Sequence, residues 1–204
     1  MSIYAAIRAV ASYLPETVEK NDTENPIVRK LGIEERHIAG KDEAASDLAI
    51  GAAKNLFAAY GIAPESIDFV LLCTQHPDYQ MPTTACHVQS ELGIPQTAGA
   101  LDYGLGCSGY PYGLGLAKGL IETGLAQHVL LLTASVYEKY INKEDAATRP
   151  LFGDGATATL VEGVESDHPL LDGFVFGTDG SRYDKLIIPV GGSRNMPRDN
   201  PEVV

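Results

Sequence analysis

Two patterns of apolar residues alternate along this chain. In the first, several apolar residues follow one another directly, which is typical of a strand covered on both faces. This pattern predicts strands at 67–74 and 128–135, and shorter or alternating versions predict strands at 3–10, 99–102, 155–161 and 171–176. In the second, apolar residues recur every three or four positions, which predicts helices at 46–60, 83–92 and 108–123.

The order of these elements predicts the fold class. Strands alternate with helices, so we expect a layered α/β fold with a mainly parallel sheet. The helix at 108–123 is apolar almost all round apart from Lys118 and Glu122, which is typical of a helix buried inside a protein. The polar stretch 16–25, followed by Pro26 and Gly32, predicts a loop with at most short helical pieces, and 187–204 predicts another loop.

Charge and cysteine content narrow the class of protein. The chain has 15 Lys and Arg against 27 Asp and Glu, a net charge of −12, so nucleic acid and anionic membranes are not expected partners. Three cysteines without a CxxC pair indicate a reducing compartment. The start at Met1 has no secretory signal pattern, and no apolar run is long enough to span a bilayer, so a cytoplasmic location is expected.

The candidate for chemistry is Cys107, which stands between a predicted strand and the apolar helix. Gly104, Gly106 and Gly109 around it permit a sharp turn, and Pro111 suits the first turn of a helix. Free N–H groups at that helix start would favour a thiolate and hold an oxyanion. The spacing alone leaves open the alternative that Cys107 is a buried, inert thiol, which is the role we expect for Cys73 and Cys86.

A second motif, Gly153-Asp154-Gly155, precedes a predicted strand and is typical of a turn. It is not a phosphate-binding loop, since it lacks the following helix and the Lys-Ser/Thr pair. The five histidines are scattered without metal-ligand spacing, so no metal site is predicted.

Taken in order, several motifs resemble the ketoacyl-ACP synthase III family of the thiolase superfamily. They are SYLPE at 12–16, GIEERHIA at 32–39, MPTTAC at 81–86, GCSG at 106–109 and LFGDGA at 151–156. The resemblance implies a thiolase-like layered α-β-α fold with a mixed, mainly parallel five-stranded sheet. It also implies an N-terminal thiolase-fold half at 1–165, which carries the cysteine, and an incomplete start of a C-terminal half at 166–204.

The resemblance implies the activity of a 3-oxoacyl-ACP synthase III-like acyltransferase. Cys107 takes an acyl group from acyl-CoA or acyl-ACP, with its own backbone N–H in the oxyanion hole. A decarboxylative Claisen condensation with malonyl-ACP follows, in fatty-acid or related acyl or polyketide biosynthesis. Acyl carrier protein is therefore an expected partner, no cofactor is expected, and a homodimer with residues 99–102 at its interface is implied.

Other site residues follow from the same resemblance. Met81 and Phe152 are expected at the acyl pocket and the dimer interface, and Lys30 and Arg149 are weaker candidates for binding substrate. Gly153, Asp154 and Gly155 are expected to be structural. Docking of the acidic carrier protein needs a local basic patch, for which the candidates are Arg182, Lys185, Arg194 and Arg198.

This sequence departs from the family's pattern in two ways, which keep alternative functions open. The chain has no Trp, although members of the family that use acetyl-CoA stack a Trp on the adenine. The family's catalytic His and Asn come from a second half that this sequence does not resemble, so the 204-residue chain alone is expected to be inactive. The alternatives are a half-synthase that binds acyl groups or a partner subunit without turnover, and a related acyl transferase or HMG-CoA-synthase-like enzyme.

Overall fold

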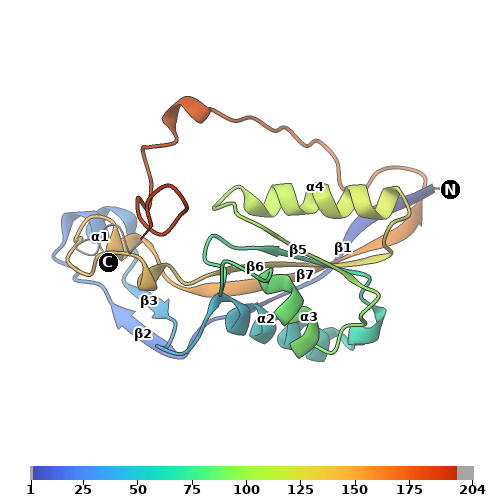
Figure 1. The fold of residues 1–204 in the computed structure, drawn as a ribbon, viewed down its shortest axis with the longest axis horizontal. Helices are drawn as coiled ribbons and strands as arrows, with labels where there is room; N and C mark the ends of the chain where they lie inside the picture. The colour runs from blue at the N-terminus through green and yellow to red at the C-terminus, as the bar shows by residue number, and fades with distance from the viewer. Residues whose placement is uncertain (1, 197–204) are drawn as a thin grey trace. The chain divides into compact units, whose positions relative to one another are not determined.

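The structure is a computed structural model that describes residues 2–196 (Figure 1). The chain divides into two units, residues 1–173 and residues 174–204. The first unit contains all the strands and α-helices of the described residues, and each unit is described by itself.

A five-stranded sheet forms the centre of the first unit. Its strands lie in the order β1-β7-β6-β4-β5. They comprise β1 (Ser2–Tyr13), β4 (Phe69–Cys73), β5 (Gly99–Tyr103), β6 (His128–Ser135) and β7 (Gly155–Ser166). β4 is parallel to β5 and β6, whereas β7 is antiparallel to both β6 and β1. Four strands therefore run one way and β7 the other, which confirms the mixed, mainly parallel sheet.

Helices cover both faces of this sheet. α2 (Ala45–Tyr60) and α3 (Thr84–Glu91) lie on one face, and α4 (Gly109–Glu122) lies on the other (Figure 1). Because successive side chains of a strand point to opposite faces, the apolar run of β6 supplies both cores. Leu130 and Leu132 pack on the α2 side, and Val129 and Leu131 pack on the α4 side. The layered α-β-α arrangement is thus confirmed.

The predicted helices end at the predicted glycines. Gly61, Gly93 and Gly124 have φ values of 63°, 68° and 76°, a left-handed conformation that glycine adopts without steric cost. The prediction that α4 is buried all round is wrong for the described residues. Only one stripe of it is buried (Gly109, Gly113, Ala117 and Ile121), while Leu116 is 43% exposed.

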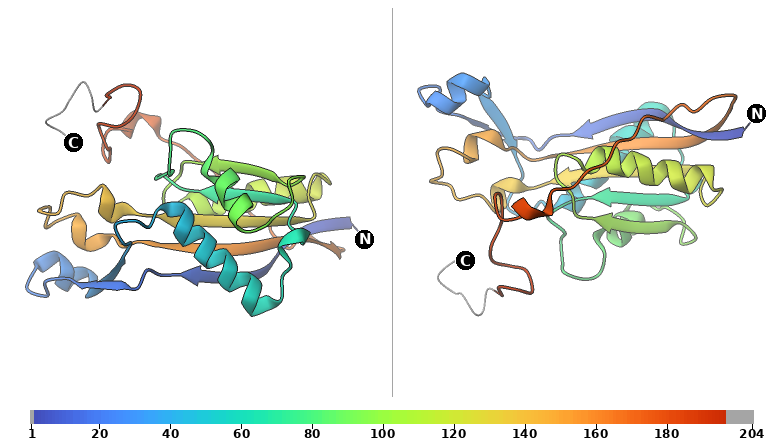
Figure 2. Two further views of the ribbon diagram at one scale, coloured as in Figure 1. Left: turned by 60° about the horizontal axis from the view of Figure 1, so that its bottom comes forward. Right: turned by 90° about the horizontal axis from the view of Figure 1, so that it is seen from above.

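The segment expected to be a loop after residue 16 contains more structure than predicted. β2 (Thr17–Lys20) and β3 (Glu35–Ile38) form an antiparallel hairpin, and α1 (Pro26–Leu31) lies between them. The side chain of Asn25 accepts a hydrogen bond from the N–H of Ile27, which caps α1. The hairpin lies at the same end of the sheet as the segment that joins β6 to β7 (Figure 2).

The predicted strand at 171–176 is wrong. These residues form no strand, and the side chain of Val175 is almost fully exposed. A strand needs a neighbour for its backbone N–H and C=O groups, and no described segment pairs with this one. The apolar residues were the right type for a strand, but the described chain supplies no partner for them.

Within the second unit, the described residues contain one short 3₁₀ turn, Gly180–Arg182, and otherwise irregular backbone. The predicted loop at 187–204 is confirmed as far as residue 196. Residues 197–204, among them the docking candidate Arg198, lie outside the described residues. The predicted boundary between residues 165 and 166 stays a prediction. In the part of the chain that the structure describes, no helix is both long and apolar enough to cross a membrane.

The close approach of α4 to the sheet gives a testable prediction. A Cβ at Gly113 would lie 2.2 Å from the Tyr103 hydroxyl and 2.5 Å from a methyl of Leu131, whereas a Cβ at Gly119 would meet nothing within 4 Å. We expect Gly113→Ala to lower the free energy of unfolding by about 2 kcal/mol through overpacking. The matched variant Gly119→Ala should raise it by about 0.5–1 kcal/mol, because alanine favours the helix. Urea unfolding measures both, and a Gly113→Ala protein as stable as the parent would contradict the packing described.

Candidate active site

Cys107 lies in the turn between β5 and α4, and its side chain is exposed. It opens into a cavity of about 490 Å³ whose lining includes Cys73, Leu105, Ser135 and Phe152. Cys73 and Ser135 are the last residues of β4 and β6, so the cavity sits at the carboxyl ends of the parallel strands. In α/β sheets this edge is where ligands commonly bind.

Gly109 allows the first turn of α4 to reach this position. A Cβ on Gly109 would lie 2.2 Å from the sulfur of Cys73, so only glycine fits between the helix and β4. The N–H of Gly109 also donates to the carbonyl oxygen of Gly106 at 2.8 Å, which closes the turn around Cys107. The sharp turn expected at these glycines is therefore confirmed between Gly106 and Gly109.

The other two cysteines have different surroundings. Cys73 is buried, its thiol donates to the carbonyl oxygen of Leu105 at 3.2 Å, and burial raises its pKa. This agrees with the structural role expected for it. Cys86 lies on α3 with an exposed side chain. The expectation that it is a buried thiol is therefore wrong.

Two residues that the sequence did not single out form one wall of the cavity. Tyr137 follows β6 and donates its hydroxyl hydrogen to Oε1 of Gln75, which follows β4. The ring of Tyr137 also packs against Phe152, with centroids 4.8 Å apart. Burial, together with the negative charge that Cys107 and Cys73 can carry, raises the pKa of Tyr137. No local motif marks Gln75 or Tyr137, but both immediately follow neighbouring parallel strands, and that placement could have found them.

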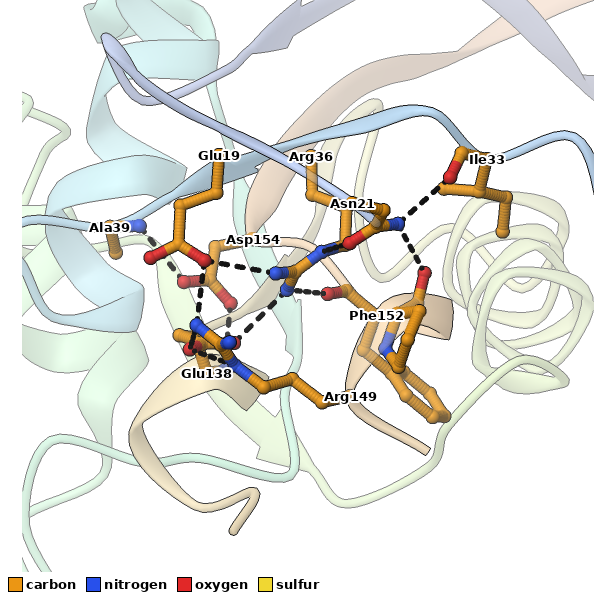
Figure 3. A network of polar contacts seen from close by, with 10 residues as sticks. Glu19, Asn21, Ile33, Arg36, Ala39, Glu138, Arg149, Phe152 and Asp154 are labelled. Atoms are coloured by element: carbon orange, nitrogen blue, oxygen red, sulfur yellow. Dashed lines mark hydrogen bonds and ion pairs between the residues drawn. The ribbon is translucent and has the colours of Figure 1, made fainter. Parts of the chain in front are cut away.

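A network of hydrogen bonds and ion pairs around the buried Arg36 and Glu138 supports this wall (Figure 3). The side chain of Arg36 is 3% exposed and donates to Glu138, Glu19 and Asn21 at 2.8–3.0 Å. It also donates to the carbonyl oxygen of Phe152 at 2.8 Å. Glu138 directly follows Tyr137, so a single guanidinium holds the backbone beside both aromatic rings.

The residues predicted to bind substrate lie elsewhere. Arg149 donates to Glu138 at 2.9 Å and to Glu19 at 2.6 Å, and the hydrogen bond to Glu138 raises its pKa. Lys30 is exposed in the last turn of α1, and Met81 is 82% exposed. None of the three lines the Cys107 cavity, whereas Phe152 does. Their predicted roles in binding remain untested.

The Gly153-Asp154-Gly155 motif joins the hairpin to the sheet. The buried carboxylate of Asp154 accepts hydrogen bonds from the N–H groups of Ala39 and Glu138, and burial raises its pKa. A Cβ on Gly153 would lie 3.1 Å from the carbonyl oxygen of His37, and one on Gly155 would lie 3.0 Å from Leu14. Glycine at position 153 therefore lets the start of β7 approach β3, and glycine at position 155 lets it approach the end of β1.

The chain is similar in sequence to proteins of known type. A sequence model of the family described as 3-oxoacyl-[acyl-carrier-protein] synthase III matches residues 101–180. A β-ketoacyl-[acyl-carrier-protein] synthase III of Caldanaerobacter subterraneus is 41% identical over 98% of this chain and 62% of its own length. Another, from Halalkalibacterium halodurans, is 39% identical over 89% of this chain and 57% of its own.

Solved structures agree with this similarity. A crystal structure of a 3-oxoacyl-(acyl-carrier-protein) synthase III has a TM-score of 0.91 and 50% identity, covering 95% of this chain and 60% of that one. The structure of the enzyme from Pseudomonas aeruginosa has a TM-score of 0.84 and 33% identity, and the match covers 94% of this chain and 62% of that one. This chain belongs to the 3-oxoacyl-ACP synthase III family. It spans about three-fifths of the length of the relatives it matches.

Within this member of the 3-oxoacyl-ACP synthase III family, the described residues contain no group of three or more His, Cys, Asp or Glu side chains placed to hold a metal ion. The cavity lining includes thiol, hydroxyl, amide and aromatic groups but no Lys, Arg, His, Asp or Glu. Cys107 is thus the exposed nucleophilic group in a largely uncharged cavity.

His76 lies behind the cavity wall of this synthase-family chain and gives a prediction for pH dependence. It is 2% exposed, its ring lies 4.5 Å from those of Tyr137 and Tyr140, and its Nε2 has no hydrogen-bond partner among the described residues. Burial lowers its pKa from 6.5 to about 4. Folding therefore favours the neutral ring, so this contribution to stability is fully present above pH 6.5 and is lost as the pH falls towards 4.

We expect His76→Phe to remove this loss, since phenylalanine keeps the ring between the tyrosines but cannot take a proton. Between pH 7 and pH 4, its free energy of unfolding should fall by about 3 kcal/mol less than that of the parent. Urea unfolding across that pH range measures the difference. His87→Phe, at an exposed histidine on α3, is the matched control for exchanging a histidine for phenylalanine outside this cluster. Identical pH profiles for parent and His76→Phe would contradict the assignment.

Proposed function

We propose that this chain loads an acyl group onto Cys107 as the first step of 3-oxoacyl-ACP synthesis. The thiolate attacks the carbonyl carbon of acyl-CoA or acyl-ACP, the donor's C–S bond breaks, and the donor leaves as its thiolate, which takes a proton from water. Loss of CO₂ from malonyl-ACP then gives a carbon nucleophile that attacks the acyl group. A C–C bond forms and the Cys107 thiolate is released. No cofactor takes part in these steps.

The observation that carries the proposal is the placement of Cys107. Its exposed thiol stands at the amino-terminal end of α4 and opens into the cavity at the carboxyl ends of β4 and β6. Cysteine suits both steps, because its thiolate is a good nucleophile and a good leaving group. The N–H of Cys107 and the start of α4 provide donors for the oxyanion that forms on the carbonyl oxygen. The names of the relatives support an acyl carrier protein as partner.

The condensation step, as the family resemblance implies it, needs a catalytic His and Asn. The cavity contains neither among the described residues. No histidine lines it, and His76, although close, is buried behind Tyr137 with a lowered pKa. We therefore propose that the chain by itself becomes acylated without condensing the acyl group. In this proposal, Phe152 packs against the acyl group and Gly153, Asp154 and Gly155 hold that wall in place.

Acylation of Cys107 is tested by incubating the folded chain with a panel of acyl-CoA thioesters. Intact mass spectrometry should show one added acyl group, and peptide mapping should place it on Cys107. Cys107→Ala should abolish the adduct. Cys86→Ala, which removes the other exposed thiol, should leave it unchanged. Adducts on Cys86, or none on Cys107 across the whole panel, would refute the proposed function.

We also propose a homodimer that forms through β5. This strand is at one end of the sheet order, pairs with β4 alone among the described strands, and carries Leu101 with 44% of its side chain exposed. An unpaired edge offers backbone N–H and C=O groups to another strand. A two-fold axis beside β5 would let two copies satisfy these groups reciprocally.

Light scattering of the chain should therefore give the mass of a dimer. Leu101→Arg places a charge on the proposed interface and should shift the mass to that of a monomer. Leu125→Arg, at an exposed leucine between α4 and β6, is the matched control and should remain a dimer. A monomeric parent chain, or a dimer that tolerates Leu101→Arg, would exclude this interface.

A further inference from the structure

Gln75 lies directly against the residue that precedes the nucleophile. A Cβ on Gly106 would lie 3.1 Å from Oε1 of Gln75 and 3.9 Å from the hydroxyl oxygen of Tyr137. Both side chains line the same cavity as Cys107. The hydrogen-bonded pair of Gln75 and Tyr137 is therefore placed beside the first carbons of any acyl group carried by the Cys107 sulfur.

Gln75 retains hydrogen-bonding capacity that its neighbours do not. Its Oε1 accepts the hydroxyl hydrogen of Tyr137, and this is the hydrogen bond that its side chain makes with the described residues, so its amide N–H groups have no acceptor there. The other hydroxyl groups of the cavity have partners. Thr133 bonds Thr157 at 2.7 Å, and Tyr110 bonds Thr159 at 3.3 Å. Water must satisfy the amide of Gln75 while the cavity is empty, because the side chain is exposed there.

An acyl group that fills the cavity removes this water. If the group is a plain alkyl chain, the amide N–H groups of Gln75 lose their acceptor and gain nothing in return. If the group carries an oxygen near the thioester, that oxygen replaces the water. A site that hydrogen-bonds a substrate oxygen discriminates against the analogue that lacks it, because the protein group is left unpaired.

We propose that Gln75 and Tyr137 determine the class of acyl group that Cys107 accepts, and that they favour a hydroxyl- or oxo-substituted acyl group over a plain alkyl group of the same length. The inference rests on the proposed function. We take the substituent to be uncharged, since no Lys or Arg among residues 2–196 lines the cavity to pair with a carboxylate. Beyond this polar pair, Leu105, Leu151 and Phe152 line the cavity, which suits an apolar tail.

Competition between matched thioesters tests the proposal. The folded chain is mixed with equal amounts of hexanoyl-CoA and 3-hydroxyhexanoyl-CoA, and the two adducts on Cys107, which differ in mass by one oxygen atom, are counted by mass spectrometry. We expect the hydroxyacyl adduct to form about tenfold faster. In Gln75→Leu the preference should be lost, since leucine has a similar size and no amide. In Tyr137→Phe it should weaken, because Gln75 is no longer held. Gln96→Leu, at an exposed glutamine between α3 and β5, is the control and should keep the parent's preference.

The possible outcomes distinguish a failure of this inference from a failure of the proposed function on which it rests. Adducts on Cys107 with no preference, or a preference that survives Gln75→Leu, overturn the role of the pair and leave the proposed function standing. Absence of any adduct on Cys107 from either thioester overturns both. Circular dichroism of each variant shows whether it folds. If Gln75→Leu does not fold, Tyr137→Phe provides an independent measurement of the preference.

Discussion

The ion pair between Arg36 and Glu138 is the interaction on which the shape of the Cys107 cavity depends. It joins β3 to the segment after β6, two regions 102 residues apart in the chain. Removing one member of a buried pair costs about 3–5 kcal/mol when the remaining charge has no other partner. Glu138 would keep Arg149 and Arg36 would keep Glu19, so the cost of separating this pair is smaller than that. The structural effect would fall on the cavity beside Cys107. Glu138 adjoins Tyr137, and Arg36 also holds the carbonyl oxygen of Phe152, so both rings of the cavity wall move if the pair separates.

The same pair explains why the hairpin formed by β2 and β3 matters, although the five-stranded sheet does not include it. Glu19 lies on β2 and Asn21 just after it, and both accept hydrogen bonds from the guanidinium of Arg36. Arg149 completes the charge balance by pairing with Glu19 and Glu138. Two arginines and two glutamates thus neutralise each other within a region where an isolated charge would be unstable. Arg149 is occupied by this balance, which accounts for its position away from the cavity.

The sequence predicted the sheet well where side chains are buried and poorly where they are not. β4 and β6 were clear because both faces are covered, so apolar residues are continuous. The hairpin was missed because β2 is largely exposed and because one of the two buried positions of β3 is the charged Arg36, so neither strand shows an apolar alternation. Cys107 could be singled out as a candidate because its glycines and the following helix are local in sequence, and the family resemblance favoured it over an inert thiol. Gln75 and Tyr137 were missed because only the parallel pairing of β4 with β6 brings them together.

The position of Cys107 ultimately follows from the small residues of α4. Gly109, Gly113 and Ala117 repeat every four positions on the face that contacts the sheet, and larger side chains would hold the helix away from β4 and β6. The helix start therefore lies near enough for Cys73 to pack beneath it. The thiol of Cys107 is consequently placed by backbone packing and not by hydrogen bonds to its own side chain. Such placement is rigid, because shifting α4 would require overpacking or an empty cavity in the core. The backbone of Cys107 is thus held in position while its sulfur stays exposed, as the proposed role of nucleophile requires.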